Sequence, residues 1–228
     1  MRSKQYYVEF VGQHGAGKTR TIHEIVNRDM LAPYAAVYPQ QLQRSRVHFA
    51  CSVPLLLVLH IRHVWFVGRF LLQYAKWNWI NYHAAARHLI KMVVLHPYYE
   101  SRFDFDIWMK DDMLHLLPRI EFQDGVEVIA VFRKYFNHFA YRYNGVVYIE
   151  LPYDVMMQRF EQRFRARDPK RKENRTPVYE RAFQQNKLLK QVLTEQTLVP
   201  VLVIDGTHDV SDNAQQVVAF IRTHIYGN

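Results

Sequence analysis

A run of eight residues near the start of the chain has the residue types and spacing that bind a phosphate chain. The pattern G-x-x-x-x-G-K-[ST] is matched at every position by Gly12, Gln13, His14, Gly15, Ala16, Gly17, Lys18 and Thr19. The glycines let consecutive backbone N–H groups curve around a phosphate without Cβ clashes. The lysine reaches the β- and γ-phosphates, and the threonine hydroxyl is a ligand for Mg²⁺. The run therefore predicts a P-loop for a nucleotide such as Mg-ATP.

The residues on either side of this run predict the strand and the helix that a P-loop needs. Tyr6 to Val11 is aromatic and β-branched, which is typical of a strand. Beyond the loop, helical spacing is kept by Ile22, Ile25, Val26 and Met30. A helix is therefore expected to begin at or near Lys18, with its positive N-terminus beside the phosphates.

Length and composition describe a globular chain. The 228 residues are enough for a single α/β domain with a sizeable core, and 49% of them are apolar. The one cysteine, Cys51, excludes an internal disulfide framework and fits a reducing compartment. Met1 leads into the first expected strand without a signal segment, so we expect a cytoplasmic protein.

Charge and hydropathy narrow the range of partners. The formal charge is +9, which suits an anionic ligand. The apolar run from Val53 to Leu59 is followed too soon by histidines and arginines to supply the roughly 20 residues of a membrane-spanning helix, so no span is expected.

The twelve histidines show neither metalloprotease spacing nor a Cys/His cluster, so no zinc site is expected. A solvated basic helix face is predicted by a seven-residue spacing at Arg62, Arg69, Lys76 and His83.

Further strands alternate with helical segments along the chain. They are expected at Ala35–Tyr38, Arg119–Gln123, Val146–Leu151 and Leu198–Ile204. This pattern predicts a parallel sheet in one domain, with a core at 1–40 and 118–228 and a helical insertion at about 41–117. A helix containing Trp108 and ending at Pro118 is expected in the insertion. Ligands of such sheets gather at the carboxyl ends of the strands.

Two groups of side chains follow from this layout as candidates for phosphoryl transfer. Asp124 comes directly after the expected third strand, where a carboxylate can serve the Mg²⁺ site or act as general base; the alternative is a simple Asp-Gly turn. Arg159, Arg163 and Arg167 share a helix face at four-residue spacing and could neutralise the moving phosphoryl group. The alternative is an exposed face eased by pairs such as Glu161 with Arg165.

Acceptor recognition has weaker candidates. Arg44 and Arg46 follow the second expected strand and could bind an anionic acceptor. A flat acceptor could stack on aromatic rings, although at helical spacing such residues more often belong to the core. These aromatic residues are Trp65, Trp77, Trp79, Tyr82 and Trp108.

These features together resemble the P-loop kinases of the nucleoside monophosphate kinase group, and most closely thymidylate kinase-like proteins. The resemblance rests on Gly12 to Thr19 followed by Arg20, on Ile149–Pro152, and on the arginine-rich helix from Arg159 to Arg167. It implies a three-layer P-loop NTPase fold with strand order 2-3-1-4-5, an acceptor-binding helical insertion and a lid at about 159–177. It also implies ATP and Mg²⁺ as cofactors.

The acceptor motifs of thymidylate kinases are missing. Gln123-Asp124-Gly125 stands where Asp-Arg-Tyr or Asp-Arg-His is usual, and Tyr38-Pro39-Gln40-Gln41 stands where Arg-Glu-Pro is usual. The sequence therefore predicts a kinase that moves the γ-phosphate of ATP to a small acceptor, either nucleotide, nucleoside or sugar-like. One alternative is a P-loop regulatory protein without an acceptor. A nucleic-acid-binding ATPase is not favoured because a second motif set is missing, and a homodimer stays open.

Overall fold

A five-stranded, all-parallel sheet forms the centre of the molecule. The computed structural model describes residues 5–13, 15–37, 61–79, 81–83, 86, 100, 103–110, 114–165 and 176–226. The strand order is β2-β3-β1-β4-β5, which is the order that the resemblance implied. The strands are β1 (Tyr6–Gly12), β2 (Ala36–Val37), β3 (Ile107–Lys110), β4 (Gly145–Glu150) and β5 (Val201–Asp205).

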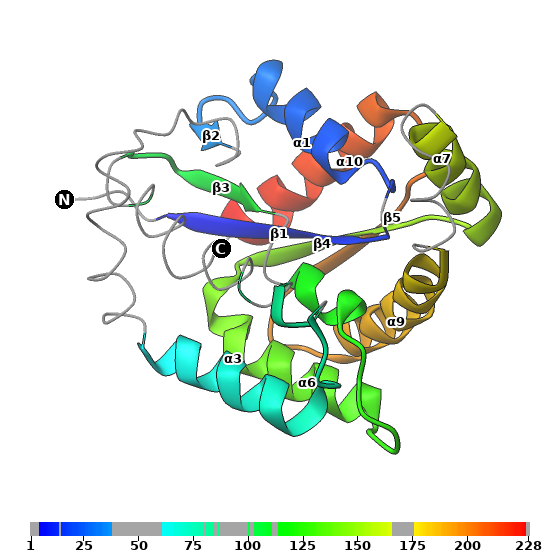
Figure 1. Cartoon of the computed structure of the whole chain (residues 1–228). Helices are drawn as coiled ribbons and strands as arrows, with labels where there is room; N and C mark the ends of the chain where they lie inside the picture. The colour runs from blue at the N-terminus through cyan, green and yellow to red at the C-terminus, as the bar shows by residue number, and fades with distance from the viewer. Residues whose placement is uncertain are drawn as a thin grey trace, which may run out of the picture.

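The sheet is covered by helices on both faces, which gives three layers (Figure 1). α1 (Lys18–Asn27) and α10 (Val210–Ile221) lie over one face, and α10 continues into a π-helical turn at Arg222–Tyr226. Val8 and Phe10 of β1 point to this side and are fully buried in the same cluster as residues of α1 and α10. Because both faces are covered, the central strands read as nearly continuous apolar runs.

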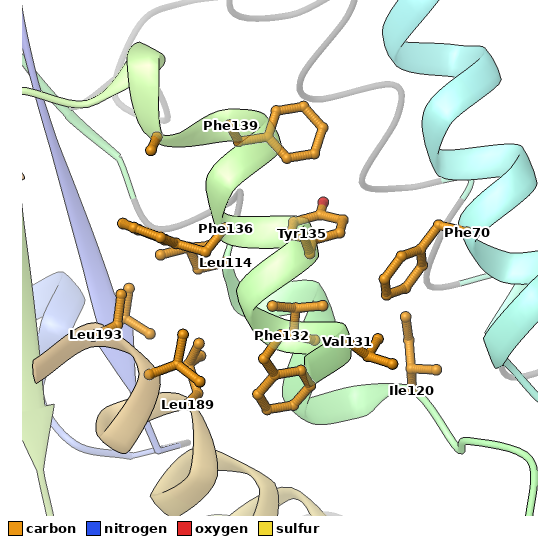
Figure 2. Packing of buried hydrophobic residues seen from close by; sticks show 14 of the residues in the cluster. Phe70, Leu114, Ile120, Val131, Phe132, Tyr135, Phe136, Phe139, Leu189 and Leu193 are labelled. Atoms are coloured by element: carbon orange, nitrogen blue, oxygen red, sulfur yellow. The ribbon is translucent and has the colours of Figure 1, made fainter. Parts of the chain in front are cut away.

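Helices α3 (Ile61–Tyr74), α6 (Val128–Phe139) and α9 (Thr176–Glu195) cover the other face. Two 3₁₀ helices, η3 (Leu114–Arg119) and η4 (Ala140–Arg142), complete this layer, and α7 (Tyr153–Arg165) follows β4. Figure 2 shows Phe70 of α3 directed at the aromatic side of α6, with Leu189 and Leu193 of α9 on its far side. The rings of Phe70 and Tyr135 meet edge-on at 5.1 Å. Many of the chain's aromatic residues are therefore core residues of this layer.

The third strand is not where the sequence pattern put it. Arg119–Gln123 is not a strand of the sheet, because η3 ends at Arg119 and Phe122 forms only an isolated antiparallel bridge with Ala75. The true third strand is Ile107–Lys110, inside the region expected to be a helix of the insertion. A short apolar run buried on both faces carries no periodicity that separates strand from helix. The core of the domain was expected to continue from residue 118 onward, but its third strand already begins at Ile107.

Two other boundaries differ for local reasons. β5 begins at Val201 and not at Leu198, because the Gln196 side chain bonds the backbone N–H of Leu198 and Val199 and the carbonyl of Val199. Helix α3 ends at Tyr74, and Trp79, residues 81–83 and Ala86 are again helical, so the helical run expected to about Leu95 is interrupted at 75–78; the stretch 87–99 lies outside the described residues. Within the described part of the chain, no helix combines the length and hydropathy needed to cross a membrane.

Candidate nucleotide site

The loop between β1 and α1 has the backbone of a phosphate cradle. Gly12, Gly15 and Gly17 all have positive φ, at 131°, 85° and 94°, which is a region that side chains with a Cβ rarely enter. α1 begins directly afterwards at Lys18, with no acidic residue in its first turn. The loop and the helix N-terminus therefore present backbone N–H groups and partial positive charge to one anion. His14 lies outside the described residues.

The cradle is held against β4 by a close backbone contact and a side-chain hydrogen bond. A Cβ on Gly12 would lie 2.1 Å from the carbonyl oxygen of Ile149, so only glycine fits between the two strands. Gln13 is 1% exposed, and its Oε1 accepts a hydrogen bond from the backbone N–H of Leu151 at 3.1 Å. The Gln13 side chain therefore holds the P-loop against the residue that follows β4.

The Lys18 side chain lies against the backbone of the P-loop. Its Nζ donates to the carbonyl oxygens of Gly12 and Gln13 at 2.8 and 2.9 Å, and the residue is 7% exposed. A buried ammonium needs such partners because desolvation is costly. Thr19 and Arg20 are exposed at the start of α1. The Thr19 hydroxyl therefore fits a Mg²⁺ ligand in accessibility and chemistry.

Of the three arginines predicted to form a lid, Arg159 is the one that the structure shows at the P-loop. Its guanidinium donates to the Gly15 carbonyl at 3.0 Å and to the Gly206 carbonyl at 3.1 Å. Helix α7 carries both Arg159 and Arg163, but only the backbone of Arg163 is described, and Arg167 lies outside the described residues. Arg159 therefore links α7 to the P-loop and to the loop after β5.

The loop after β5 packs tightly against the P-loop. A Cβ on Gly206 would lie 2.8 Å from the Glu150 carbonyl and 2.9 Å from the Ala16 carbonyl. Asp205 accepts hydrogen bonds from the Thr207 backbone and hydroxyl at 2.8 and 2.7 Å, and these bonds lower the pKa of its carboxyl. The carboxyl ends of β1, β4 and β5 thus meet at one edge of the sheet, the edge beside α7 in Figure 1.

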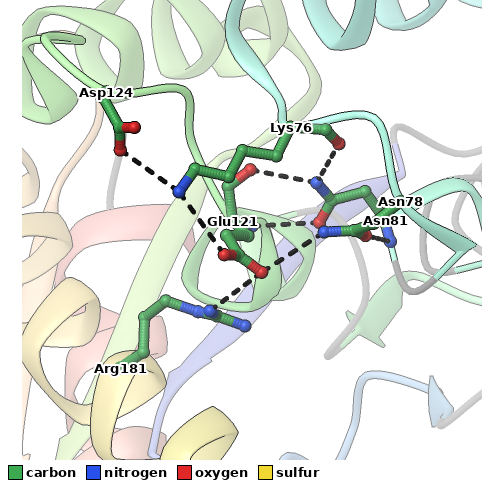
Figure 3. A network of polar contacts seen from close by, with 6 residues as sticks. All are labelled: Lys76, Asn78, Asn81, Glu121, Asp124 and Arg181. Atoms are coloured by element: carbon green, nitrogen blue, oxygen red, sulfur yellow. Dashed lines mark hydrogen bonds and ion pairs between the residues drawn. The ribbon is translucent and has the colours of Figure 1, made fainter.

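Asp124 does not end a strand of the sheet, so the prediction that it lies at the end of the third strand is wrong. It lies in a turn after Phe122, is 97% exposed, and pairs with Lys76 at 3.1 Å. Figure 3 shows that this turn belongs to a polar network at the end of α3. The hydrogen bond that Lys76 donates to the Asp124 carboxylate raises the pKa of Lys76, and Glu121 binds Arg181 of α9 at 3.1 Å.

Asn81 completes that network by satisfying backbone groups on both sides. Its Nδ2 donates to the carbonyls of Lys76 and Glu121, and its Oδ1 accepts from the Glu121 N–H at 2.9 Å. Asn78 accepts from the Asn81 N–H at 2.8 Å and donates to the Glu121 carboxylate at 3.2 Å. The described contacts therefore give this cluster a structural role, which is to join α3, α9 and the turn before α6.

Two buried charges beside the cradle were missed from the sequence. Glu9 of β1 is fully buried and accepts a hydrogen bond from the Leu114 N–H at 3.2 Å. Its register partner on β3 is Lys110, which binds Glu100 at 2.6 Å and lies 4.2 Å from the Tyr7 ring centroid. Burial lowers the pKa of Lys110, while Glu100 opposes that shift. A charged residue inside an otherwise apolar strand is the sequence signal by which this cluster could have been found.

Other candidates lie beyond what the structure describes. Arg44 and Arg46 are outside the described residues, so their role in acceptor binding stays a prediction. The described residues contain no group of three or more His, Cys, Asp or Glu side chains that could hold a metal ion. The sequence continues from Lys110, the end of β3, with Asp111 and Asp112, which are also outside the described residues.

Comparison with known proteins shows no family for the chain, although solved structures are similar to it. No protein-family model and no curated protein match the chain. A deoxyadenosine kinase from M. mycoides with bound dCTP is similar over 95% of this chain and 99% of its own, at 11% sequence identity and a TM-score of 0.43. The fold class therefore rests on the chain itself. An all-parallel sheet of order 2-3-1-4-5 with a P-loop between β1 and α1 is a P-loop kinase α/β fold.

Proposed function

We propose that this protein is a phosphotransferase that moves the γ-phosphate of Mg-ATP to a small-molecule acceptor. The observation that carries the proposal is the convergence of Lys18, Arg159 and the glycine-rich cradle at one edge of the sheet. Phosphoryl transfer asks a protein mainly for positioning and for neutralisation of charge. These groups supply both on the donor side.

Each residue has a separate part in the proposed transfer. The loop N–H groups hold the β-phosphate, and Lys18 exchanges its two carbonyl partners for phosphate oxygens. Arg159 exchanges the Gly15 and Gly206 carbonyls for the γ-phosphate, to which its planar donors are well matched. An acceptor oxygen then bonds to the γ-phosphorus, the bond to the β-phosphate oxygen breaks, ADP leaves with that electron pair, and the acceptor proton passes to a base.

The Mg²⁺ site needs a carboxylate in addition to Thr19. We propose that Asp111 or Asp112 supplies it, because they follow the corrected third strand, and carboxyl ends of parallel strands share one edge of a sheet. Asp124→Asn is the matched control, since Asp124 pairs with Lys76 in an exposed turn. A loss of Mg²⁺-dependent turnover of about 100-fold or more is expected for Asp111→Asn or Asp112→Asn and not for Asp124→Asn.

The experiment that tests the function is ADP production from Mg-ATP with nucleosides, nucleotides and sugars offered one at a time. One acceptor should raise turnover well above the basal rate, the phosphorylated acceptor should be found by mass spectrometry, and Lys18→Ala should abolish both signals. If ATP binds and every acceptor in a broad panel leaves the rate unchanged, the regulatory P-loop protein replaces the kinase. The nucleoside, nucleotide or sugar class of the acceptor is read from the same panel.

A further inference from the structure

Helix α3 is apolar on two opposite faces. Its inner face carries Val67 and Phe70, which are buried in the core shared with α6. On the opposite side Ile61, Trp65 and Leu72 are 62%, 71% and 57% exposed. These three residues are called the outer face of α3 below. A surface helix ordinarily turns one apolar face to the core and a polar face to water, so this second apolar face needs an explanation.

The outer face is a continuous stripe and not three scattered residues. Steps of four and seven residues, from Ile61 to Trp65 and from Trp65 to Leu72, keep side chains on one line of a helix. Gly68 lies on the same line, and a Cβ placed there would meet nothing within 4 Å. A contiguous exposed apolar patch is typical of a surface that binds another protein, a ligand or a membrane.

The charged side chains that α3 itself carries beside the stripe are all cationic, while the acids Glu121 and Asp124 pair with Lys76 beyond the end of the helix. Arg62 and Arg69 are exposed beside it, and in the described part of the chain neither is paired with a carboxylate. Arg62 instead donates to the Tyr141 hydroxyl at 2.9 Å. Between Asp29 and Glu100 the sequence contains no acidic residue at all, while arginine and lysine recur through it. The surface that faces this stripe is therefore expected to be anionic.

Two more indoles are exposed just after α3. Trp77 and Trp79 are 72% and 80% exposed, with Trp79 stacked on His83. The expectation that the tryptophans of this region are core residues is therefore wrong for these two and for Trp65, and right for the fully buried Trp108. Tryptophan side chains are favoured where an apolar phase meets water, because the ring is apolar and its N–H is polar.

We propose that the outer face of α3 binds the surface of an anionic lipid membrane, with the helix lying in the plane of the interface. Apolar side chains on one line, arginines beside them and exposed tryptophans are the features that such helices use. The proposed binding is peripheral, with the helix at the surface of the bilayer. This inference goes beyond the proposed kinase activity and does not depend on it.

Two other occupants fit the stripe less well. A second copy of the chain would place the same patch against itself, so Arg62 and Arg69 of one copy would meet those of the other with no acidic residue on the stripe to pair with them. Single-stranded nucleic acid binds through stacking on aromatic rings, which Ile61 and Leu72 do not offer. A lipid surface accepts the aliphatic residues, the indole and the arginines together.

The test is flotation of the full chain with vesicles of phosphatidylcholine alone or with about 30% phosphatidylglycerol, with no nucleotide present. The wild-type protein should float with the anionic vesicles and much less with the neutral ones. Leu72→Ser should lower binding about tenfold. Leu198→Ser is the matched control, because Leu198 is 59% exposed in the connection before β5, and its substitution should leave binding unchanged.

Charge is tested by a second matched pair. Arg69→Gln should weaken binding to anionic vesicles about fivefold, and Lys187→Gln, which removes one exposed cation from α9, should change it little. Brominated lipid should quench the wild-type tryptophan fluorescence on binding, and Trp65→Phe should remove part of that quenching. All variants change exposed side chains, and thermal unfolding of each confirms that it is folded.

Three results would overturn the proposal. The first is a wild-type protein that fails to float with anionic vesicles at low salt. The second is a wild-type dimer, seen by light scattering, that Leu72→Ser converts to a monomer while vesicle binding is absent; the stripe is then an interface between copies. The third is tight binding of a single-stranded oligonucleotide that Leu72→Ser abolishes, which would make the surface a nucleic-acid site.

Discussion

Replacing Gly12 by alanine tests whether the cradle is held against β4 as the structure describes. The added Cβ would lie 2.1 Å from the Ile149 carbonyl oxygen and 3.0 Å from its carbon, so β1 and β4 must move apart where they pair. Overpacking of this kind costs about 1–3 kcal/mol. The φ of 131° adds about 1–3 kcal/mol for a residue with a Cβ. The free energy of unfolding should therefore fall by about 4 kcal/mol.

Gly17→Ala is the control for the backbone term alone. Gly17 has a φ of 94°, and a Cβ placed there would meet nothing within 4 Å. Its substitution should cost only about 1–2 kcal/mol. For a chain of this size each kcal/mol lowers the melting temperature by about 2–4 °C, so the two variants should differ by several degrees in thermal unfolding without nucleotide. Equal losses in the two variants would refute the close contact between Gly12 and β4.

Three further predictions follow from single residues. Gly68→Ala lies in helix α3 with open space around it, so it should raise the unfolding free energy by about 1 kcal/mol; unchanged or lower stability in urea unfolding would contradict this. Arg159→Ala should weaken Mg-ATP binding about tenfold or more through lost contacts to the loop and the phosphate, whereas the exposed Gln162→Ala on the same helix should not. Burial, together with Arg62 and Arg142, lowers the pKa of His138 in the folded protein. The unfolded chain therefore binds more protons, and the free energy of unfolding should fall as the pH drops below about 6.5. His138→Gln should flatten that part of the pH–stability curve, and an unchanged slope would contradict the role assigned to His138.

The P-loop end of the fold could be predicted because the residues that determine it are close together in the sequence. Gly12, Gly15 and Gly17 adopt backbone conformations that other residues avoid. The strand before them and the helix after them each have a recognisable residue pattern. The same holds for β4, which the sequence placed within one residue at each end. Arg159 was chosen for its helical spacing, but its partners, the Gly15 and Gly206 carbonyls, could be known only from the fold.

The third strand and the metal carboxylate depended on long-range contacts. Ile107–Lys110 is a strand because β1 and β2 pair with it on both sides, and four residues contain no periodicity to show this. Arg119–Gln123 has strand-like residue types, yet Asn81, 40 residues away, binds its backbone groups and holds it outside the sheet. Asp124 was predicted for the metal site because it follows Arg119–Gln123, so this prediction depended on the wrong third strand.

Calorimetric titration of Mg-ATP into the wild-type protein and Lys18→Ala tests the central claim most directly. The ammonium of Lys18 lies against the Gly12 and Gln13 carbonyls, where phosphate oxygens are proposed to bind it. The wild-type protein should bind with a Kd between about 1 μM and 1 mM, and Lys18→Ala should bind at least about tenfold more weakly. A folded wild-type protein that gives no heat of binding, or equal affinity in the two proteins, would contradict the assignment of this loop as a nucleotide site.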